Sequence, residues 1–282
     1  MLDPLGVVTI LDGPIGTELA RRGVETPLPL WSAAAIRSAP DVLAAIHRDY
    51  AAAGATVHTA NTFRTSPWSL EKAGRADAGA LTSDAVAIAR AAVPAGHRVA
   101  GCLAPLEDCY RPDLSPPEVA ARPAHGRMAR LLADAGVDLI LCETFPHPGE
   151  ALIALDAALA TGLPVWLSLT AGPDGDLLDD AAILATAHEA AERGASAVLA
   201  NCVRRERLDV LLPRLATLPV PTGGYGNVGA PCEEHGWRTE GLDDPEPYAQ
   251  HVLRWVDAGA QIVGGCCGTT PAHIAAIAPL LA

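Results

Sequence analysis

Short apolar runs alternate with longer Ala- and Leu-rich segments along nearly the whole chain. Each run has the length and near-continuous apolarity of a strand that is buried on both faces, as strands in parallel sheets are. Because a parallel strand needs a crossover to reach its neighbour, the alternation predicts repeated strand–helix units. The predicted strands are Val7–Leu11, Ala55–Ala60, Arg98–Leu103, Asp138–Cys142, Pro164–Leu169, Ala197–Ala200, Pro219–Gly224 and Ala260–Gly264.

A segment with helical spacing follows each of these runs. Several begin with Pro, which suits the first helical turn, and several are followed by Gly, which suits the position after a helix end. The predicted helices are Pro40–Ala53, Ala76–Ala92, Pro117–Ala135, Pro148–Thr161, Asp179–Arg193, Arg205–Thr217, Pro245–Ala258 and Pro271–Leu281.

Eight strand–helix units in 282 residues predict an α/β fold of the closed kind, the (β/α)8 TIM barrel, as a single domain spanning residues 1–282. A doubly wound open sheet is the alternative. Its Gly-rich fingerprint is not matched by the segment after the first strand, Asp12-Gly13-Pro14-Ile15-Gly16-Thr17.

Composition excludes several classes of partner. The chain has 33 acidic and 20 basic residues, a formal net charge of -13, which argues against binding nucleic acid or an anionic membrane surface. No apolar stretch approaches the roughly 18 residues that a membrane-spanning helix needs. Since Met1–Pro4 lacks the positive segment of a secretory signal, we expect a cytoplasmic protein. An odd number of cysteines, seven, argues against a disulfide framework and favours metal binding or catalysis for any that cluster.

Polar and metal-capable side chains collect where the predicted strands end. Because the carboxyl ends of barrel strands form one face, which carries the active site in enzymes of this fold, these side chains are expected to meet there. Three longer connections, residues 66–77, 107–117 and 227–244, leave the same face. The side chains concerned are Asp12, Asn61, Glu143, Cys202, Asn227, Cys266 and Cys267.

Cys202, Cys266 and Cys267 form a candidate zinc site. Zinc takes thiolates in tetrahedral geometry, and catalytic zinc sites keep one position open. The alternative is that a free cysteine is a small buried hydrophobe, and we favour that interpretation for Cys102, Cys109, Cys142 and Cys232.

The other candidates also have plainer interpretations. Asp12 is typical of a turn, and Asn61 and Asn227 of turns or caps. A carboxylate at Glu143 is costly to bury without a partner, so it should meet a cationic ligand group or a buried Arg. His58 and His273 are expected to be structural.

In chain order, the strand-end motifs closely resemble those of the homocysteine S-methyltransferase family. The resemblance spans nearly the whole chain, and its last motif is the most specific. The motifs are Leu11-Asp12-Gly13 with Gly16-Thr17-Glu18-Leu19, Ala60-Asn61-Thr62-Phe63, Cys142-Glu143-Thr144, Asn201-Cys202, Gly226-Asn227-Val228-Gly229 and Gly264-Gly265-Cys266-Cys267-Gly268-Thr269-Thr270-Pro271.

This resemblance implies a Zn2+ site of Cys202, Cys266 and Cys267, with the homocysteine thiol in the fourth position and Asn227 there before the substrate arrives. It implies that Asp12 and Glu143 bind the substrate ammonium group, and that backbone amides at Ile15, Gly16 and Thr17 bind its carboxylate. Asn61 is counted with the substrate-binding residues. Pro14-Ile15 departs from the family pattern, which alters this wall of the pocket.

The expected reaction is methyl transfer from a sulfonium donor, S-methylmethionine or S-adenosylmethionine, to homocysteine. Betaine would call for an aromatic cage, and aromatic residues make up only 4% of the chain. Trp31, Trp68 and Tyr110 are candidates for donor contacts or for packing. The chain shows no cobalamin- or folate-binding module, so it is not expected to act alone as a corrinoid-dependent methionine synthase.

Four alternatives stay open at this point. The acceptor is another small thiol or selenol such as selenocysteine, the chain depends on a separate carrier protein, or it is a non-catalytic zinc-binding barrel. An unrelated aldolase- or isomerase-type barrel is disfavoured, because the only lysine, Lys72, is expected in a loop. A homodimer is possible through apolar helix faces.

Overall fold

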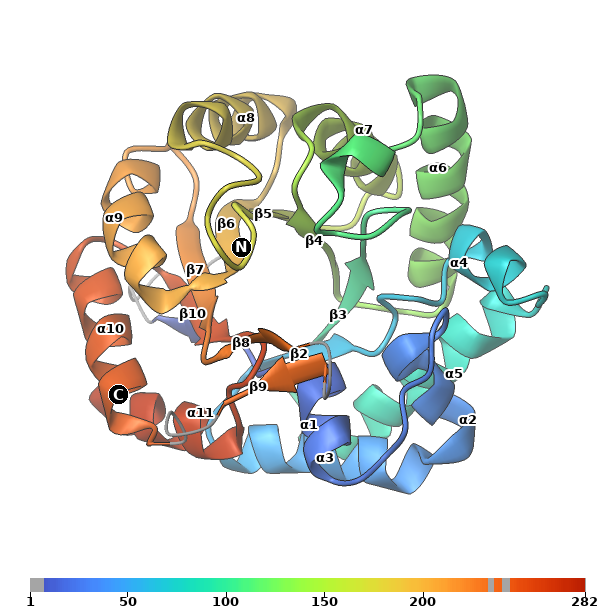
Figure 1. Cartoon of the computed structure of the whole chain (residues 1–282), viewed down its shortest axis with the longest axis horizontal. Helices are drawn as coiled ribbons and strands as arrows, with labels where there is room; N and C mark the ends of the chain where they lie inside the picture. Colours follow the sequence, from blue (N-terminus) through green and yellow to red (C-terminus); the bar gives the residue numbers. More distant parts are fainter. Residues whose placement is uncertain (1–7, 233–235, 240–243, 282) are drawn as a thin grey trace.

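The computed structural model describes residues 8–232, 236–239 and 244–281. Its eight parallel strands form one sheet in the order β1-β10-β7-β6-β5-β4-β3-β2. A parallel bridge between Leu11 and Val57 joins the first strand to the last in this order and closes the sheet into a barrel. Helices surround this ring on the outside (Figure 1). The predicted (β/α)8 TIM barrel is therefore confirmed.

The main elements agree closely with the prediction. Pro lies in the first turn of several helices, and the side chain of Asp179 caps α8 by accepting the N–H of Ala182 at 2.7 Å. The barrel strands are β1 Thr9–Ile10, β2 Val57–Ala60, β3 Arg98–Leu103, β4 Leu139–Phe145, β5 Val165–Leu169, β6 Ala197–Arg204, β7 Thr222–Asn227 and β10 Ile262–Gly265. The outer helices are α3 Pro40–Ala52, α5 Ala78–Ala92, α6 Glu118–Asp134, α7 Pro148–Leu159, α8 Asp180–Arg193, α9 Arg205–Leu215, α10 Glu246–Asp257 and α11 Pro271–Ile277.

Most differences from the prediction lie in the connections after the strands. Short elements that the sequence pattern did not reveal are α1 Ile15–Arg21, η1 Trp31–Ala34, α2 Ala35–Ser38, α4 Pro67–Lys72, η2 Pro112–Leu114, η3 Ala278–Leu280 and the hairpin of β8 Ala230–Cys232 with β9 Gly236–Arg238.

Three predictions need correction or qualification. Lys72 ends helix α4 and does not lie in a loop. Asn227 is the last residue of β7 and does not follow that strand, because the strand runs three residues past its predicted end. Of the predicted first strand, Val7 lies outside the described residues, as do parts of the 227–244 connection.

Strand alternation divides the core into two layers. One set of strand residues fills the barrel interior, among them Val57, Leu139, Leu199 and Ile262. Their neighbours along each strand point outward and pack under the helices in a much larger apolar cluster. Both faces of every strand are thus buried, which accounts for the near-continuous apolar runs in the sequence.

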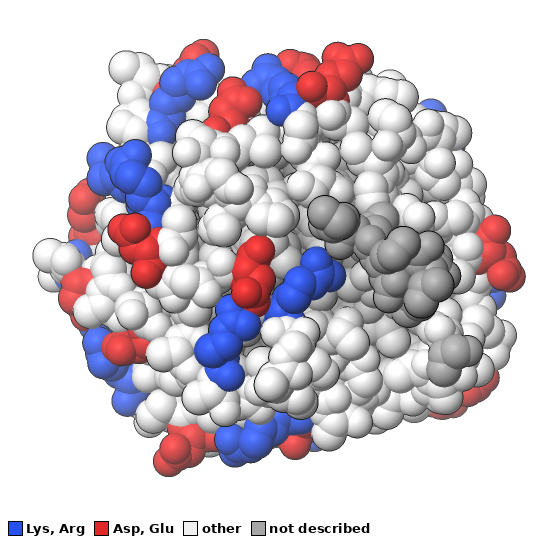
Figure 2. Space-filling view, turned by 180° about the vertical axis from the view of Figure 1, so that it is seen from behind, with Lys and Arg blue, Asp and Glu red and all other residues white. Residues whose placement is uncertain are grey.

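Charged side chains of both signs are dispersed over the barrel face shown in Figure 2, the side opposite the view of Figure 1. Within the described part of that face, Lys and Arg do not form one continuous patch. Among the described residues there is no helix long and apolar enough to cross a membrane.

Candidate metal and substrate site

A cavity of about 330 Å³ opens at the carboxyl ends of the strands. Its volume is at the lower end of the usual range for small-molecule sites. The predicted residues Asp12, Ile15, Gly16, Thr17, Asn61, Glu143, Cys202, Cys266 and Cys267 all line it. Residues from strands far apart in the sequence therefore meet at one end of the barrel, as their positions at strand ends predicted.

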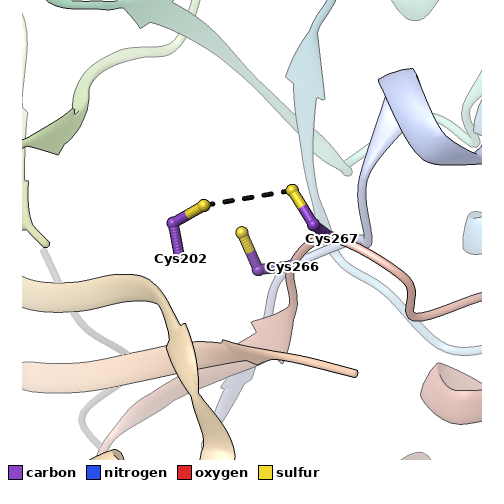
Figure 3. Close-up of side chains that lie close together, drawn as sticks. All are labelled: Cys202, Cys266 and Cys267. Atoms are coloured by element: carbon purple, nitrogen blue, oxygen red, sulfur yellow. Dashed lines mark hydrogen bonds between the residues drawn. The ribbon is translucent and has the colours of Figure 1, made fainter. Parts of the chain in front are cut away.

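The three candidate ligands converge at the floor of this cavity (Figure 3). The sulfur atoms of Cys202, Cys266 and Cys267 all lie within 4.8 Å of one another, and the Cys202 and Cys267 sulfurs are 3.9 Å apart. Three thiolates at the usual zinc–sulfur distance of about 2.3 Å in tetrahedral geometry would be about 3.8 Å apart. The donor set and its spacing thus fit a zinc ion without rearrangement of the backbone.

An irregularity in β6 turns Cys202 inward. Leu199 and Asn201 face the interior, so regular alternation would send the next residue out toward the helices. Instead, the register with β7 shifts between Asn201 and Arg204, and Cys202 takes a left-handed φ of 55°. Two successive side chains therefore face the cavity, at a backbone cost on the order of 1–3 kcal/mol. Val203 then resumes the outward position.

A matching irregularity occurs in β4. The register with β5 shifts between Cys142 and Phe145, and Thr144 has a φ of 63°. Glu143 and Thr144 consequently both line the cavity, while Cys142 and Phe145 pack outside. The amide of Asn201 donates to the Thr144 hydroxyl at 2.8 Å and links the two irregular strands.

The backbone after the cysteine pair makes a tight turn. Gly268 has a φ of +81°, and a Cβ there would lie 1.8 Å from the carbonyl oxygen of Val228. Its N–H donates to the hydroxyl of Thr17 at 3.1 Å. A residue without a side chain is therefore required at this position for Cys266 and Cys267 to follow β10 into the cavity.

The pKa values of the three thiols differ. Hydrogen bonds from Cys266, and next from Cys267, hold the pKa of Cys202 well below its ordinary value despite burial. The same interaction raises the pKa of both Cys266 and Cys267. Cys202 is therefore the most acidic of the three thiols, and coordination of a divalent cation by all three would require the remaining thiol protons to leave.

Asn227 lies beside this cluster. Its Oδ1 and Nδ2 atoms are buried, and its amide lies close enough to Cys202 to lower the pKa of that thiol by hydrogen bonding. Neither amide atom has a well-formed hydrogen bond to a described residue, and leaving a buried amide so poorly paired is costly. An amide in this state, next to three thiols, is a further sign that the site is built for a ligand.

Two carboxylates face the cavity, Asp12, which is buried, and Glu143, which is half-buried. Burial raises the pKa of Asp12 well above its ordinary value, and nearby Glu143 adds to the effect. Burial also raises the pKa of Glu143, which accepts hydrogen bonds from Tyr225 at 2.9 Å and from Cys102 at 3.2 Å. No described Arg pairs with Glu143, so the buried Arg expected as one possible partner is not found among the described residues.

The histidines behind Asp12 do not supply a positive charge. Asp12, His47 and His58 offer ligand atoms within 4.8 Å of one another. However, burial lowers the pKa of His47 to about 3 and that of His58 to about 4, so both rings are neutral near pH 7. His58 is bonded to His97 at 3.0 Å and does not line the cavity, in keeping with the structural role expected of it.

Other predicted residues have local partners. Asn61 accepts from the Ser32 hydroxyl and donates to the Ser32 carbonyl, both at 2.8 Å, so it anchors the segment before α2 at the cavity wall. His273 accepts the N–H of Thr270 at 3.1 Å in a capping box, which is the structural role expected for it. Ile15, Gly16 and Thr17 form the first turn of α1, where backbone N–H groups have no acceptor within the helix.

The loop after β3 covers part of the cavity. Its Tyr110 hydroxyl lies 2.9 Å from the Cys202 sulfur. The carboxylate of Glu150 secures both ends of this loop, because it accepts from the Leu106 N–H at 2.8 Å and from the Ser115 hydroxyl at 2.6 Å. His125, at 3.1 Å, holds that carboxylate from α6.

Of the aromatic candidates for donor contacts, Trp31 and Tyr110 line the cavity, whereas Trp68 does not and donates to Glu107 at 3.0 Å.

Cys142 is the buried apolar residue that was expected. Cys102 and Cys109 were also expected to be small buried apolar residues, but both line the cavity. The side chain of Cys232 lies outside the described residues.

Sequence reasoning missed several contributors to the site. Tyr225, Asn201, Arg64 and Thr144 were assigned no role. Tyr225 and Asn201 stand at strand ends, the signal that located the other candidates, but only the fold reveals that they touch Glu143 and Thr144.

Fold and site together define a barrel enzyme with three converging thiols and two carboxylates, one buried and one half-buried, at its catalytic face. Comparison with known proteins makes the assignment narrower. The family model described as homocysteine S-methyltransferase matches residues 9–281. The chain belongs to the homocysteine S-methyltransferase family, and is accordingly a methyltransferase.

Individual relatives are similar to this chain over nearly their full lengths. The homocysteine S-methyltransferase of Escherichia coli (strain K12) is 32% identical, with 96% of this chain and 94% of that protein covered. The selenocysteine Se-methyltransferase of Brassica oleracea var. italica is 28% identical, with 98% and 90% covered. The crystal structure of the homocysteine methyltransferase MmuM from Escherichia coli in its metallated form has a TM-score of 0.82 at 28% identity, with 97% and 96% covered.

Proposed function

We propose that this protein is a zinc-dependent S-methyltransferase that moves a methyl group from a sulfonium donor, S-methylmethionine or S-adenosylmethionine, to the thiol of homocysteine, giving methionine. The observation that carries the proposal is the meeting of three cysteine sulfurs and the carboxylates of Asp12 and Glu143 in one cavity. This arrangement matches an acceptor that has a thiol at one end and an ammonium group at the other.

Cys202, Cys266 and Cys267 would hold the zinc ion. When bound, zinc provides a place where the acceptor thiol, with an ordinary pKa near 8.5, loses its proton at neutral pH. Asn227, whose buried amide lies beside Cys202, is proposed to take the open position before the acceptor arrives.

Asp12 and Glu143 are proposed to bind the ammonium group of homocysteine. Without a cation, burial raises the pKa of both carboxyls, and the charge of Glu143 raises that of Asp12 further. An ammonium group between them would offset that rise, so the pair is selective for an amine. The N–H groups of Ile15, Gly16 and Thr17 are proposed to bind the carboxylate of the acceptor, and Asn61 supports the adjoining wall.

The transfer balances without any further reactant. A lone pair of the acceptor thiolate forms the new S–CH3 bond, while the donor's S–CH3 bond breaks and leaves its electron pair on the donor sulfur. The sulfonium becomes a neutral thioether, and the proton of the acceptor thiol has already passed to solvent. The protein's part is to orient the acceptor, to exclude water and to keep the negative charge of the cavity facing the cationic donor.

Zinc content and turnover test the proposal together. Protein purified without chelators and kept reduced is expected to carry one zinc per chain and to form methionine from homocysteine with one of the two sulfonium donors. Cys266→Ala should lose both properties. Cys142→Ala is the matched control, because it removes a buried cysteine from the outer face of β4 and should retain both.

Two other outcomes would contradict the proposal in different ways. Reduced protein without zinc would overturn the proposed mechanism. One zinc per chain without turnover from either donor would favour a chain that depends on a carrier protein, or a non-catalytic zinc-binding barrel.

Selenocysteine is the second candidate acceptor, because the Brassica oleracea relative named for it covers 98% of this chain. The two acceptors also bind differently, since selenocysteine is one methylene shorter between its reactive atom and its amine. Comparing kcat/KM for homocysteine, selenocysteine and cysteine identifies the acceptor: a preference for homocysteine supports the first proposal, and a preference for selenocysteine replaces it.

A further inference from the structure

One cation faces an otherwise acidic cavity. Among the described residues that line it, Arg64 is the only one with a positively charged side chain, whereas Asp12, Asp108 and Glu143 are acidic. Arg64 follows the end of β2 and stands on the β2–β3 side, near Cys102 and Cys109. Burial raises the pKa of both thiols, and the charge of Arg64 opposes part of this rise.

The barrel order places the strand that leads to Arg64 opposite the strand that carries Cys202. In the ring of eight strands, β2 and β6 are separated by three strands on either side. Cys202 is on β6, so a ligand that touches Arg64 at one end must extend over the cavity to reach the cluster of sulfurs.

The guanidinium group of Arg64 is held in place but is largely unpaired. It lies over the Phe63 ring at 5.4 Å from the centroid, and Phe63 packs edge-on against Trp31 at 5.8 Å between centroids. One of its terminal nitrogens donates to the Glu107 carbonyl at 3.2 Å. Its Nε atom is buried and has no acceptor, and no described carboxylate lies within ion-pairing distance.

A guanidinium has five N–H donors, and this one uses few of them within the protein. A half-buried, permanently charged fork with unused donors is suited to a carboxylate, which can accept two parallel hydrogen bonds. The contact with the Phe63 ring and the hydrogen bond to the Glu107 carbonyl limit the positions of the side chain, so less rotational freedom is lost when an anion binds.

We propose that Arg64 forms the subsite for the carboxylate of the methyl donor. This inference rests on the proposed function, in which Asp12, Glu143 and the amides of Ile15–Thr17 already serve the acceptor. With its carboxylate at Arg64, an amino-acid sulfonium spans the cavity and directs its methyl group toward the sulfurs, and the rings of Phe63 and Trp31 form the adjoining wall. The donor is thereby defined as a sulfonium that carries a carboxylate.

The test compares two donors that differ only in that carboxylate, S-methylmethionine and its neutral carboxamide. The wild-type enzyme is expected to prefer the acid in kcat/KM by about 10- to 150-fold, the range for a hydrogen bond to a charged group. In Arg64→Gln the acid should lose this advantage while the carboxamide is used as before. Calorimetric titration of each donor into the zinc-loaded protein should show the same pattern in Kd.

Control variants separate this role from a structural one. Arg64→Lys keeps the charge without the fork and should fall between the wild type and Arg64→Gln. Arg111→Gln removes an exposed cation of the loop after β3, paired with Asp113, and should leave the preference intact. Zinc content, melting temperature and the KM for homocysteine are expected to be unchanged in all three variants.

Two results would overturn the inference. An equal preference for the acid in wild type and Arg64→Gln would show that another group holds the carboxylate. A rise in the KM for homocysteine, with the donor preference kept, would assign Arg64 to the acceptor. Turnover by the wild type decides the proposed function separately, because the inference depends only on the ratio between the two donors.

Discussion

Replacing Asp12 by Asn should weaken acceptor binding and stabilise the ligand-free protein at the same time. The side chain is 4% exposed, and its Oδ2 atom accepts the N–H of Thr59 at 2.9 Å. An Asn side chain is nearly isosteric and can still accept that hydrogen bond through its carbonyl oxygen. The substitution therefore removes a charge with little loss of packing.

The size of the binding effect follows from the lost charge. A hydrogen bond to a charged group contributes about 1.5–3 kcal/mol, which corresponds to about 10- to 150-fold in affinity for homocysteine. Glu143 remains to bind the ammonium group, so binding is expected to weaken within this range and not to vanish.

The stability effect has the opposite sign. Because burial raises the pKa of Asp12 in the folded state, the fold binds more protons than the unfolded chain between the ordinary pKa and the raised one. The contribution of this group to stability is thus greatest at low pH and is lost as the pH rises through that window. Near neutral pH, Asp12→Asn removes this penalty, and each 1 kcal/mol of relief corresponds to a rise of about 2–4 °C in Tm for a chain of this size.

Calorimetric titration with homocysteine and thermal unfolding without ligand measure the two effects. Asp134→Asn, the same change at an exposed position in α6, is the control and should alter neither. If Asp12→Asn bound homocysteine as tightly as the wild type, Asp12 would not be an ammonium ligand. If its Tm fell instead, the carboxylate would be a stabilising group and the reasoning from its raised pKa would be wrong.

Two further predictions concern proton linkage and the turn after the cysteine pair. Since the pKa values of Asp12 and Glu143 are both raised, an ammonium ligand must displace protons from them. The affinity for 2-aminobutyrate, which lacks a thiol, should therefore fall as the pH drops from about 8 to about 5, with proton release on binding, and a constant Kd would contradict the assignment. Gly268→Ala would place a Cβ 1.8 Å from the Val228 carbonyl oxygen, so zinc per chain measured by metal analysis should fall. Gly136→Ala, also at positive φ (+79°) but with nothing within 4 Å of its Cβ, should keep its zinc, and equal zinc content in both variants would refute the steric argument.

Local patterns were enough to predict the barrel and most of the candidate site. Parallel strands buried on both faces need continuous apolar runs, and crossover helices need a 3.6-residue spacing, so both leave a mark that does not depend on distant residues. The same logic located the side chains at the strand ends, because a barrel gathers those ends on one face. The end of β7 was misjudged because its Thr-Gly-Gly-Tyr-Gly-Asn sequence is not an apolar run.

Only the tertiary structure revealed how the strands depart from regular alternation and which side chains then meet. Alternation alone would turn Cys202 away from the cavity, and the register shift against β7 reverses this. Tyr225 reaches Glu143 across 82 residues, and Tyr110 reaches Cys202 across 92. Such contacts depend on how neighbouring strands and loops pack around the cavity, and left-handed φ values at Thr144 and Cys202 are tolerated only because that packing holds them. Local sequence carries no signal for an energy that arises between distant segments.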